Sequence, residues 1–291
     1  MRKDIQLPLL ALLGGAAGFS LRLWQWKSAY NSESQLFTRH APATFALLAV
    51  LAVVAVLLLV MVRNVPAPGE FLPAFYSPNA GHMTMMVIGA FLLLGGGLLG
   101  VLNGMDKLEY WRQMSSYNPG AVPLAPALVQ MVCSVLCLPA GVSLLLVGKS
   151  TYRLTMPKAV FPLISMTGFA GLLWTLAIHL AHGVDPVLMN YGFLLLAAAL
   201  LTLAHYYAAA FLFGHPCPRR FTFFALSGFV AALTALADTP RPADAMLLLG
   251  FALSALVLAA ALLRNTFGPA QPMPERMPLG AEDTDEDTEE A

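Results

Sequence analysis

The histidines are the residues whose type and spacing most directly suggest chemistry. His179 and His182 stand three apart in an apolar segment, so they lie on one face of a helix, and Asp185 follows shortly after. Imidazole nitrogens and a carboxylate are ordinary zinc ligands, and these three residues could form a metal site at a helix end. No other Asp, Glu or Cys accompanies them at ligand spacing, so we expect neither a metal nor another cofactor.

A second group consists of polar side chains inside apolar segments. His205 lies on the span after His179, and because consecutive spans run antiparallel, the two rings are expected near opposite membrane faces, too far apart to share an iron. His205 is expected instead to make hydrogen bonds between helices or to line a polar cavity. The other candidates for these two roles are Asn103, Gln130, Asn190 and Tyr206.

Arg22 is the only Lys or Arg that we place within a predicted span. An ionisable residue in a membrane is a candidate for function, but Arg22 lies near one end of its helix, from which its long side chain can reach the interface. If a carboxylate holds it instead, the candidates on the same side are Glu33, Asp106, Glu109 and Asp185.

Several catalytic signatures are absent from the sequence. It contains no Walker, HExxH or GxSxG motif, and the predicted spans contain no acidic residue apart from Asp244, at the very start of the last span. Cys133 and Cys137, one helical turn apart in an apolar segment, are expected to act as small hydrophobic residues. An enzyme or a proton-coupled pump is therefore disfavoured, whereas a carrier of uncharged molecules is not.

Composition indicates which elements must position these residues. Hydrophobic residues make up 58% of the 291-residue chain and charged residues only 11%, whereas roughly a quarter of a soluble protein is charged. Apolar runs of about 20 residues, the length that crosses a bilayer, recur along the chain. We predict an all-α bundle of eight transmembrane helices within residues 1–268. The predicted spans are 7–23, 42–62, 83–103, 123–147, 159–182, 187–213, 221–237 and 243–263.

Glycines at four-residue spacing predict where these helices pack. They are Gly14 and Gly18 in the first span and Gly96, Gly100 and Gly104 in the third. Such spacing leaves one helix face without side chains, so that another backbone can approach closely.

Two loops are longer than simple connectors. Residues 63–82 combine prolines with aromatic side chains and are expected to lie along the membrane surface. Residues 103–122 are expected to form one or two turns of interfacial helix on the other side.

The distribution of Lys and Arg predicts the orientation of the bundle. With the amino terminus in the cytoplasm, ten of the 16 Lys and Arg residues fall on the cytoplasmic side and six on the other, as the positive-inside rule requires. An even number of spans then places the carboxyl terminus inside as well. Residues 269–291, rich first in proline and then in acidic residues, are expected to form a disordered cytoplasmic tail.

Short stretches spread along the chain resemble uncharacterised multispanning membrane proteins of gut Firmicutes. These stretches are residues 14–25, 41–46, 185–188, 206–207, 214–220 and 262–265. The resemblance implies a multi-pass protein and supplies no activity and no catalytic residue. We expect the protein in a bacterial cytoplasmic membrane.

Three functional interpretations stay open. The favoured one is a bundle without ATP hydrolysis that binds or moves a small, largely uncharged molecule through a cavity among the third to sixth spans. The second is a scaffold that recruits a protein partner through loop 63–82 and the acidic tail. The third is a membrane enzyme with an outward-facing pocket formed by His179, His182, Asp185 and Arg22. The lipid bilayer is a partner in all three, and nucleic acid in none.

Overall fold

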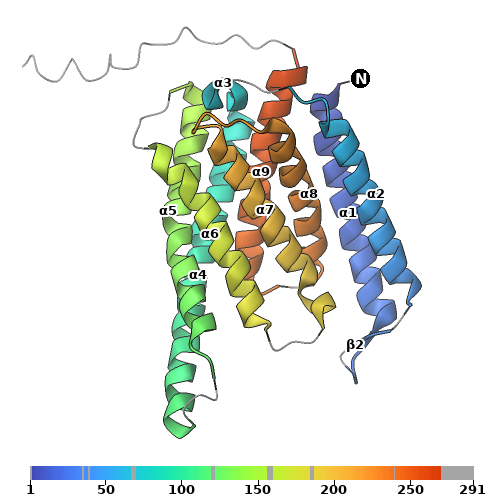
Figure 1. Ribbon diagram of the computed structural model, residues 1–291, viewed down its shortest axis with the longest axis vertical. Coiled ribbons are helices and arrows are strands. Elements are labelled where there is room, and N and C mark those ends of the chain that lie inside the picture. Colours follow the sequence, from blue (N-terminus) through green and yellow to red (C-terminus); the bar gives the residue numbers. More distant parts are fainter. Residues whose placement is uncertain are drawn as a thin grey trace, which may run out of the picture.

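The computed structural model shows a bundle of long helices (Figure 1). It describes residues 2–34, 36–38, 40–66, 70–118, 122–155, 160–183, 187–238 and 240–269. The helices are α1 (Lys3–Ala29), α2 (Pro42–Val62), α3 (Phe71–Phe75), α4 (Ala80–Tyr117), α5 (Ala125–Arg153), α6 (Val160–Ala181), the 3-10 turn η1 (Leu188–Asn190), α7 (Gly192–Ala210), α8 (Pro218–Leu236) and α9 (Pro242–Phe267). A short antiparallel hairpin, β1 (Tyr30–Asn31) and β2 (Leu36–Phe37), follows α1.

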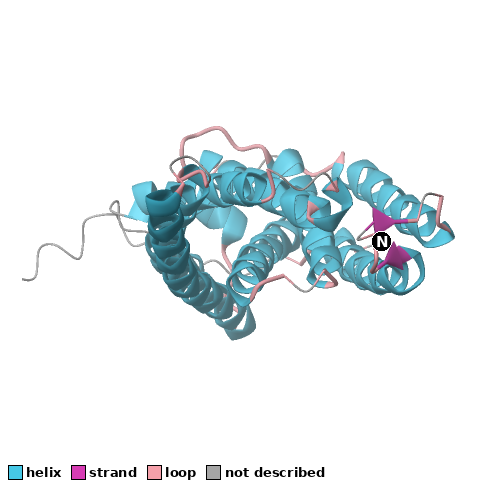
Figure 2. Ribbon diagram, turned by 90° about the horizontal axis from the view of Figure 1, so that it is seen from below, coloured by secondary structure: helices cyan, strands magenta, loops and turns pink. Residues whose placement is uncertain are grey.

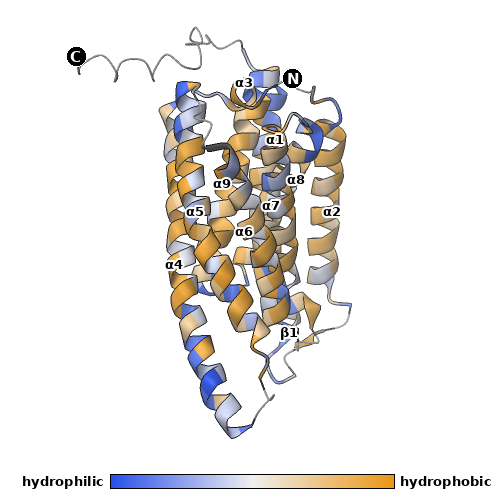
Figure 3. Cartoon of the chain, turned by 60° about the vertical axis from the view of Figure 1, so that its left-hand side comes forward, coloured by the Kyte–Doolittle hydropathy of each residue, from blue (hydrophilic) through white to orange (hydrophobic). Residues whose placement is uncertain are grey.

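Eight of the described helices, α1, α2 and α4 to α9, are long and apolar enough to cross a bilayer. Figure 3 shows that apolar residues predominate along these helices, and many large apolar side chains are exposed on the outer surface of the bundle. Val60 and Phe91, for example, are 64% and 61% exposed on that surface, where hydrocarbon rather than water is the favourable solvent. The chain is therefore an all-α, multi-pass integral membrane protein in contact with lipid, which confirms the predicted fold class and number of spans.

Helix α9 is the centre of the bundle and α2 lies at its edge. In the most apolar stretch of 18 consecutive residues, 72% of the residues of α9 are buried, against 22% of those of α2. Helices α4 to α8 follow one another around α9, and α1 and α2 form a pair beside α8 (Figure 2). Helices α4 and α8 pack directly on α9, whereas the backbones of α5 and α6 stay further from it. Side chains must therefore fill the space between α5, α6 and α9.

Glycines bring the helix backbones together as the sequence predicted. A Cβ atom at Gly14 would lie 2.8 Å from a methyl group of Val54 on α2, and one at Gly96 would lie 2.9 Å from the Leu247 side chain on α9. The same holds for Gly100, where a Cβ atom would collide with Ser134 on α5. The two glycine faces are therefore filled by neighbouring helices.

We call the two ends of the bundle the termini end and the hairpin end. Helix α1 begins and α9 ends at the termini end, and the β-hairpin lies at the opposite, hairpin end (Figure 1). Helix α4 extends past the other helices at the hairpin end, over 38 residues in all. The expectation of a separate interfacial helix within 103–122 is wrong for the described part, because no helix-breaking proline occurs before Pro119 and α4 simply continues to Tyr117.

Helix α3 is the second departure from the predicted arrangement. It lies at the termini end, where Phe71 and Phe75 are only 4% and 0% exposed. The expectation that this part of the 63–82 loop lies on the membrane surface is therefore wrong, because its aromatic side chains turn into the bundle. The Pro-rich acidic tail falls almost entirely in 270–291, outside the described residues.

Candidate functional site

Arg22 on α1 is fully buried, with an exposed fraction of 0%. Its Nε donates a hydrogen bond to Asp238 Oδ1 at 2.6 Å. One terminal nitrogen donates to Gln25 Oε1 at 2.5 Å, and the other donates to the carbonyl oxygen of Met189 at 2.6 Å. The guanidinium therefore satisfies its charge inside the protein and does not extend to the interface.

Three aromatic rings enclose the same guanidinium. Its carbon lies 5.2 Å from the ring centre of Trp26, 5.1 Å from that of Phe37 and 4.9 Å from that of Phe193. Such rings attract a cation through their negative faces and replace part of its lost hydration. Because the rings belong to α1, β2 and α7, and the carboxylate follows α8, the cluster ties the α1–α2 pair to the rest of the bundle.

Asp238 is the member of this cluster that sequence analysis missed. Its side chain is 8% exposed, and Trp26 Nε1 also donates to Oδ1, at 2.7 Å. Burial raises the pKa of the Asp238 carboxyl, while the charge of Arg22 and the hydrogen bonds from Arg22 and Trp26 act in the opposite direction. The available signal was its place just after the seventh span, at the same membrane face as Arg22.

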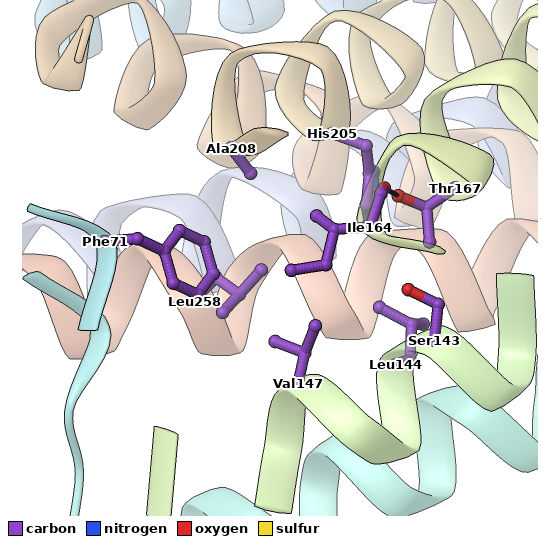
Figure 4. A pocket seen from close by; sticks show the side chains of 9 residues that line it. All are labelled: Phe71, Ser143, Leu144, Val147, Ile164, Thr167, His205, Ala208 and Leu258. Carbon is purple, nitrogen blue, oxygen red and sulfur yellow. Dashed lines mark hydrogen bonds between the residues drawn. The ribbon is translucent and has the colours of Figure 1, made fainter. Parts of the chain in front are cut away.

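A second polar group surrounds a small internal cavity between α5, α6, α7 and α9 (Figure 4). Its polar lining consists of Ser143, Thr167 and His205, and its volume is about 10 Å³, room for about one water molecule. The buried Ser143 hydroxyl has no hydrogen-bond partner among the described residues, so a water molecule in the cavity would satisfy it. The apolar lining consists of Phe71, Leu144, Val147, Ile164, Ala208 and Leu258.

His205 is held on both sides of its ring and is 2% exposed. Nδ1 lies 2.9 Å from the carbonyl oxygen of Leu201, and Nε2 lies 3.0 Å from Ser254 Oγ. Because a carbonyl oxygen can only accept, Nδ1 carries the proton, and in the neutral ring Nε2 accepts from the Ser254 hydroxyl. The ring is therefore fixed in one orientation beside the cavity.

An aromatic column continues from His205 towards the hairpin end. His205 packs edge-on against Phe251, with ring centres 5.3 Å apart, and Phe251 stacks on Trp174 at 5.5 Å. Trp174 Nε1 then donates to Asp244 Oδ1 at 3.3 Å. These side chains fill the space that separates α5 and α6 from α9, so the column passes through the interior of the bundle.

Helix α3 closes the cavity at the termini end. Phe71 lines the cavity, and Phe75 packs against the rings of Phe211 and Phe221 at 5.0 and 5.4 Å. The side-chain amide nitrogen of Asn265 on α9 lies within hydrogen-bond distance of three carbonyl oxygens of this segment, at 3.1, 3.0 and 2.8 Å, those of Pro73, Ala74 and Tyr76, and its two N–H groups are shared among them. Local hydrogen bonds and aromatic contacts thus hold α3 in place.

The other predicted site residues lie in separate places. Gln130 accepts a hydrogen bond from Lys107 Nζ at 2.9 Å, and the half-buried Asn103 stands one turn before Lys107 on α4. Tyr206 is 61% exposed on the outside of α7. Asn190 is half-buried in η1. Of the polar residues singled out in the sequence, only His205 lines the internal cavity.

The proposed metal ligands are not brought together within the described residues. His179 is exposed, whereas the His182 ring stacks on Tyr191 with ring centres 4.6 Å apart. Asp185 lies outside the described residues. In the part of the chain that the structure describes, no group of three or more His, Cys, Asp and Glu residues could hold a metal ion.

Known proteins give no match. No family model matches the chain, and neither curated proteins nor solved structures show a significant similarity to it. The resemblance to multispanning proteins of gut Firmicutes therefore stays a prediction, and function must be argued from the geometry alone.

The two polar clusters differ in what they can do. Arg22 and Asp238 neutralise each other, and aromatic rings cover them, so the cluster acts as a connection between helices in this conformation. The cavity is instead lined by two hydroxyl groups and an imidazole, of which only the Ser143 hydroxyl lacks a hydrogen-bond partner among the described residues, and its lining carries no Asp, Glu, Lys or Arg. Hydrogen bonding to a small neutral molecule is the chemistry that the cavity can support.

Proposed function

We propose that the protein binds and moves a small, uncharged polar molecule through the interior between α5, α6, α7 and α9. The structure corresponds to a closed form of that route. The membrane is the cytoplasmic membrane of a bacterium, with the termini end in the cytoplasm, as the excess of Lys and Arg at that end supports.

The observation that carries this proposal is a small interior cavity that contains a buried hydroxyl without a partner, that of Ser143, and that is lined at the termini end by a helix that does not cross the membrane. A buried hydroxyl without a partner costs about 1–3 kcal/mol, and an apolar residue at Ser143 would avoid that cost. Helix α3 is only 5 residues long, so it can leave its place without disturbing a span. Moving Phe71 would open the cavity towards the termini end.

The lining restricts the class of molecule that can pass. A charged substrate would lose its hydration without meeting a charged partner in the cavity, which is strongly unfavourable. A neutral molecule with one or two hydrogen-bonding groups could pair with the Ser143 hydroxyl and donate to the Thr167 hydroxyl oxygen, whose own proton goes to the Ile164 carbonyl. We therefore expect small amides, alcohols or similar solutes rather than ions.

A scaffold is the second candidate, and the small size of the cavity favours it. About 10 Å³ holds no solute larger than water, so a bundle that never opens would serve only as a platform. The third interpretation, an enzyme with an outward-facing pocket, required Arg22 to meet the histidines. Arg22 is instead enclosed by Asp238 and three rings, and no contact within the described part of the chain favours that interpretation.

Accessibility of the cavity tests the proposal. Ser143→Cys is introduced into a variant whose three native cysteines are replaced by alanine, and the protein is reconstituted in liposomes. A small methanethiosulfonate reagent should modify this cysteine at a measurable rate. Phe71→Gly should raise the rate by at least about tenfold, because removing a buried aromatic side chain costs about 3–5 kcal/mol.

Thr222→Cys is the matched control, because Thr222 is also fully buried, lies on the first turns of α8 at the termini end and does not line the cavity. It should stay unmodified in both backgrounds. If Ser143→Cys reacts no faster than Thr222→Cys, even with Phe71→Gly, the interior does not open and the scaffold is the better explanation.

A further inference from the structure

A groove opens sideways between α4 and α5 at the termini end. It has a volume of about 310 Å³ and lies outside the internal cavity. Its walls are formed by Ala80, Met83, Thr84 and Val87 from α4 and by Tyr152 from α5. The four α4 residues share one helix face, since Met83, Thr84 and Val87 follow Ala80 by three, four and seven positions. This groove therefore faces the lipid, with two polar groups and an otherwise apolar wall.

The contact between the two helices fixes the depth of the groove. A Cβ atom at Gly148 would lie 3.1 Å from Met86 Cβ, so these residues stand at the same level on antiparallel helices. Tyr152, one turn further along α5, is then level with the first turn of α4. From Ala80 to Val87 the groove runs about 10 Å along the helix. It therefore lies where the headgroup and glycerol region gives way to hydrocarbon.

Two cations on α5 are close in sequence to Tyr152, although neither lines the groove. Lys149, Tyr152 and Arg153 stand at spacings of three and four on α5, so they share a face, and all three are exposed. Residues 80–92 and 140–155, which form this part of both helices, contain no Asp or Glu. The mostly apolar groove thus lies between helix segments whose net charge is positive.

We propose that this groove binds an anionic phospholipid. Lys149 and Arg153 meet its phosphate, Thr84 and Tyr152 lie beside the glycerol esters, and the first part of an acyl chain follows Met83 and Val87. Basic grooves between membrane helices bind acidic lipid headgroups in this way. The inference is independent of the carrier function, because the groove and the internal cavity lie on different sides of α5 and share no lining residue.

Native mass spectrometry of the detergent-purified protein tests the inference. Phosphatidylglycerol should bind in a one-to-one complex, and phosphatidylcholine with the same chains should bind much more weakly. The double variant Lys149→Gln, Arg153→Gln should lower the affinity for phosphatidylglycerol by roughly 30-fold, equivalent to about 1 kcal/mol for each basic residue. Thr84→Trp, which fills the groove and keeps both charges, should also lower it.

Arg63→Gln, Arg264→Gln is the control, because both residues are exposed at the termini end and lie on other helices. It removes the same charge and should leave the lipid affinity unchanged. The proposal would be overturned if the control lost as much affinity for phosphatidylglycerol as the Lys149→Gln, Arg153→Gln variant. Equal binding of phosphatidylglycerol and phosphatidylcholine would also overturn it. So would complete competition by glycerol phosphate, since an anion without acyl chains would then suffice.

Discussion

The guanidinium of Arg22 illustrates what a single residue requires inside a membrane protein. Removing a charge from water costs several kcal/mol, and Arg22 recovers this through three hydrogen-bond acceptors and three aromatic rings. Asp238 is its ion-pair partner at 2.6 Å. The stability of this region should therefore depend on the pair as a unit rather than on either residue alone.

Asp238→Asn should destabilise the protein by about 3 kcal/mol, because Arg22 would then be a buried charge without a counter-charge. Arg22→Met combined with Asp238→Leu should recover part of this loss, since apolar residues often replace buried ion pairs at little cost. Thermal unfolding in detergent measures both effects. Glu33→Gln, at an exposed acid of the hairpin end, is the control, and an unchanged Tm for Asp238→Asn would show that the pair contributes nothing.

At the scale of elements, close backbone approach fixes where each helix lies. Helices α4 and α9 meet at Gly89 and Gly250, where a Cβ atom on Gly250 would lie 2.9 Å from the Gly89 carbonyl oxygen. A backbone atom cannot move aside as a flexible side chain can. The central helix is therefore positioned by missing side chains as much as by apolar packing.

Gly250→Ala should destabilise the bundle by about 1–3 kcal/mol, because the added methyl group overpacks this contact. Gly168→Ala is the matched substitution, since its nearest neighbours would lie 3.8 Å away, an ordinary contact distance. Its Tm should stay the same or rise slightly, as alanine favours helix. Equal Tm values for both variants would contradict the argument from close approach.

Helix α3 depends on one side chain for several of its hydrogen bonds. Asn265→Leu should remove the donor to Pro73, Ala74 and Tyr76 and loosen the segment. Hydrogen exchange of the backbone amides in 71–77 should then accelerate, by roughly tenfold for a loss of about 1.4 kcal/mol. Thr266→Val removes a hydrogen bond within α9 itself and should leave exchange in 71–77 unchanged. If the amides of 71–77 exchanged at the same rate in both variants, the aromatic contacts alone would hold α3 in place.

At the scale of the whole molecule, an even number of spans, eight, places the start of α1 and the end of α9 on the same side of the membrane and the β-hairpin on the other. Glu70→Cys, at an exposed position of the termini end, should react with an impermeant maleimide only after the cells are opened. Tyr117→Cys, 87% exposed at the hairpin end, should react in intact cells. The reverse pattern would invert the proposed orientation and place Lys149 and Arg153 at the outer leaflet.

Sequence alone determined the class of the protein and its spans, because crossing a bilayer depends on the length and composition of one continuous segment. The predicted second span coincides with α2, Pro42–Val62. The predicted third span, 83–103, is shorter than α4, Ala80–Tyr117. A span predicted from hydropathy ends where polar residues begin, whereas a helix continues until a residue such as proline interrupts its backbone hydrogen bonds.

Only the tertiary structure decided which polar residues meet. Arg22 and Asp238 are 216 positions apart, and no local pattern pairs them. His205 faces the cavity while its neighbour Tyr206 faces lipid, yet both occupy a helix that is apolar on all sides. In a soluble helix, the polar face would identify the exterior. In a membrane both the lipid and the core are apolar, so contacts between helices alone determine which face turns inward.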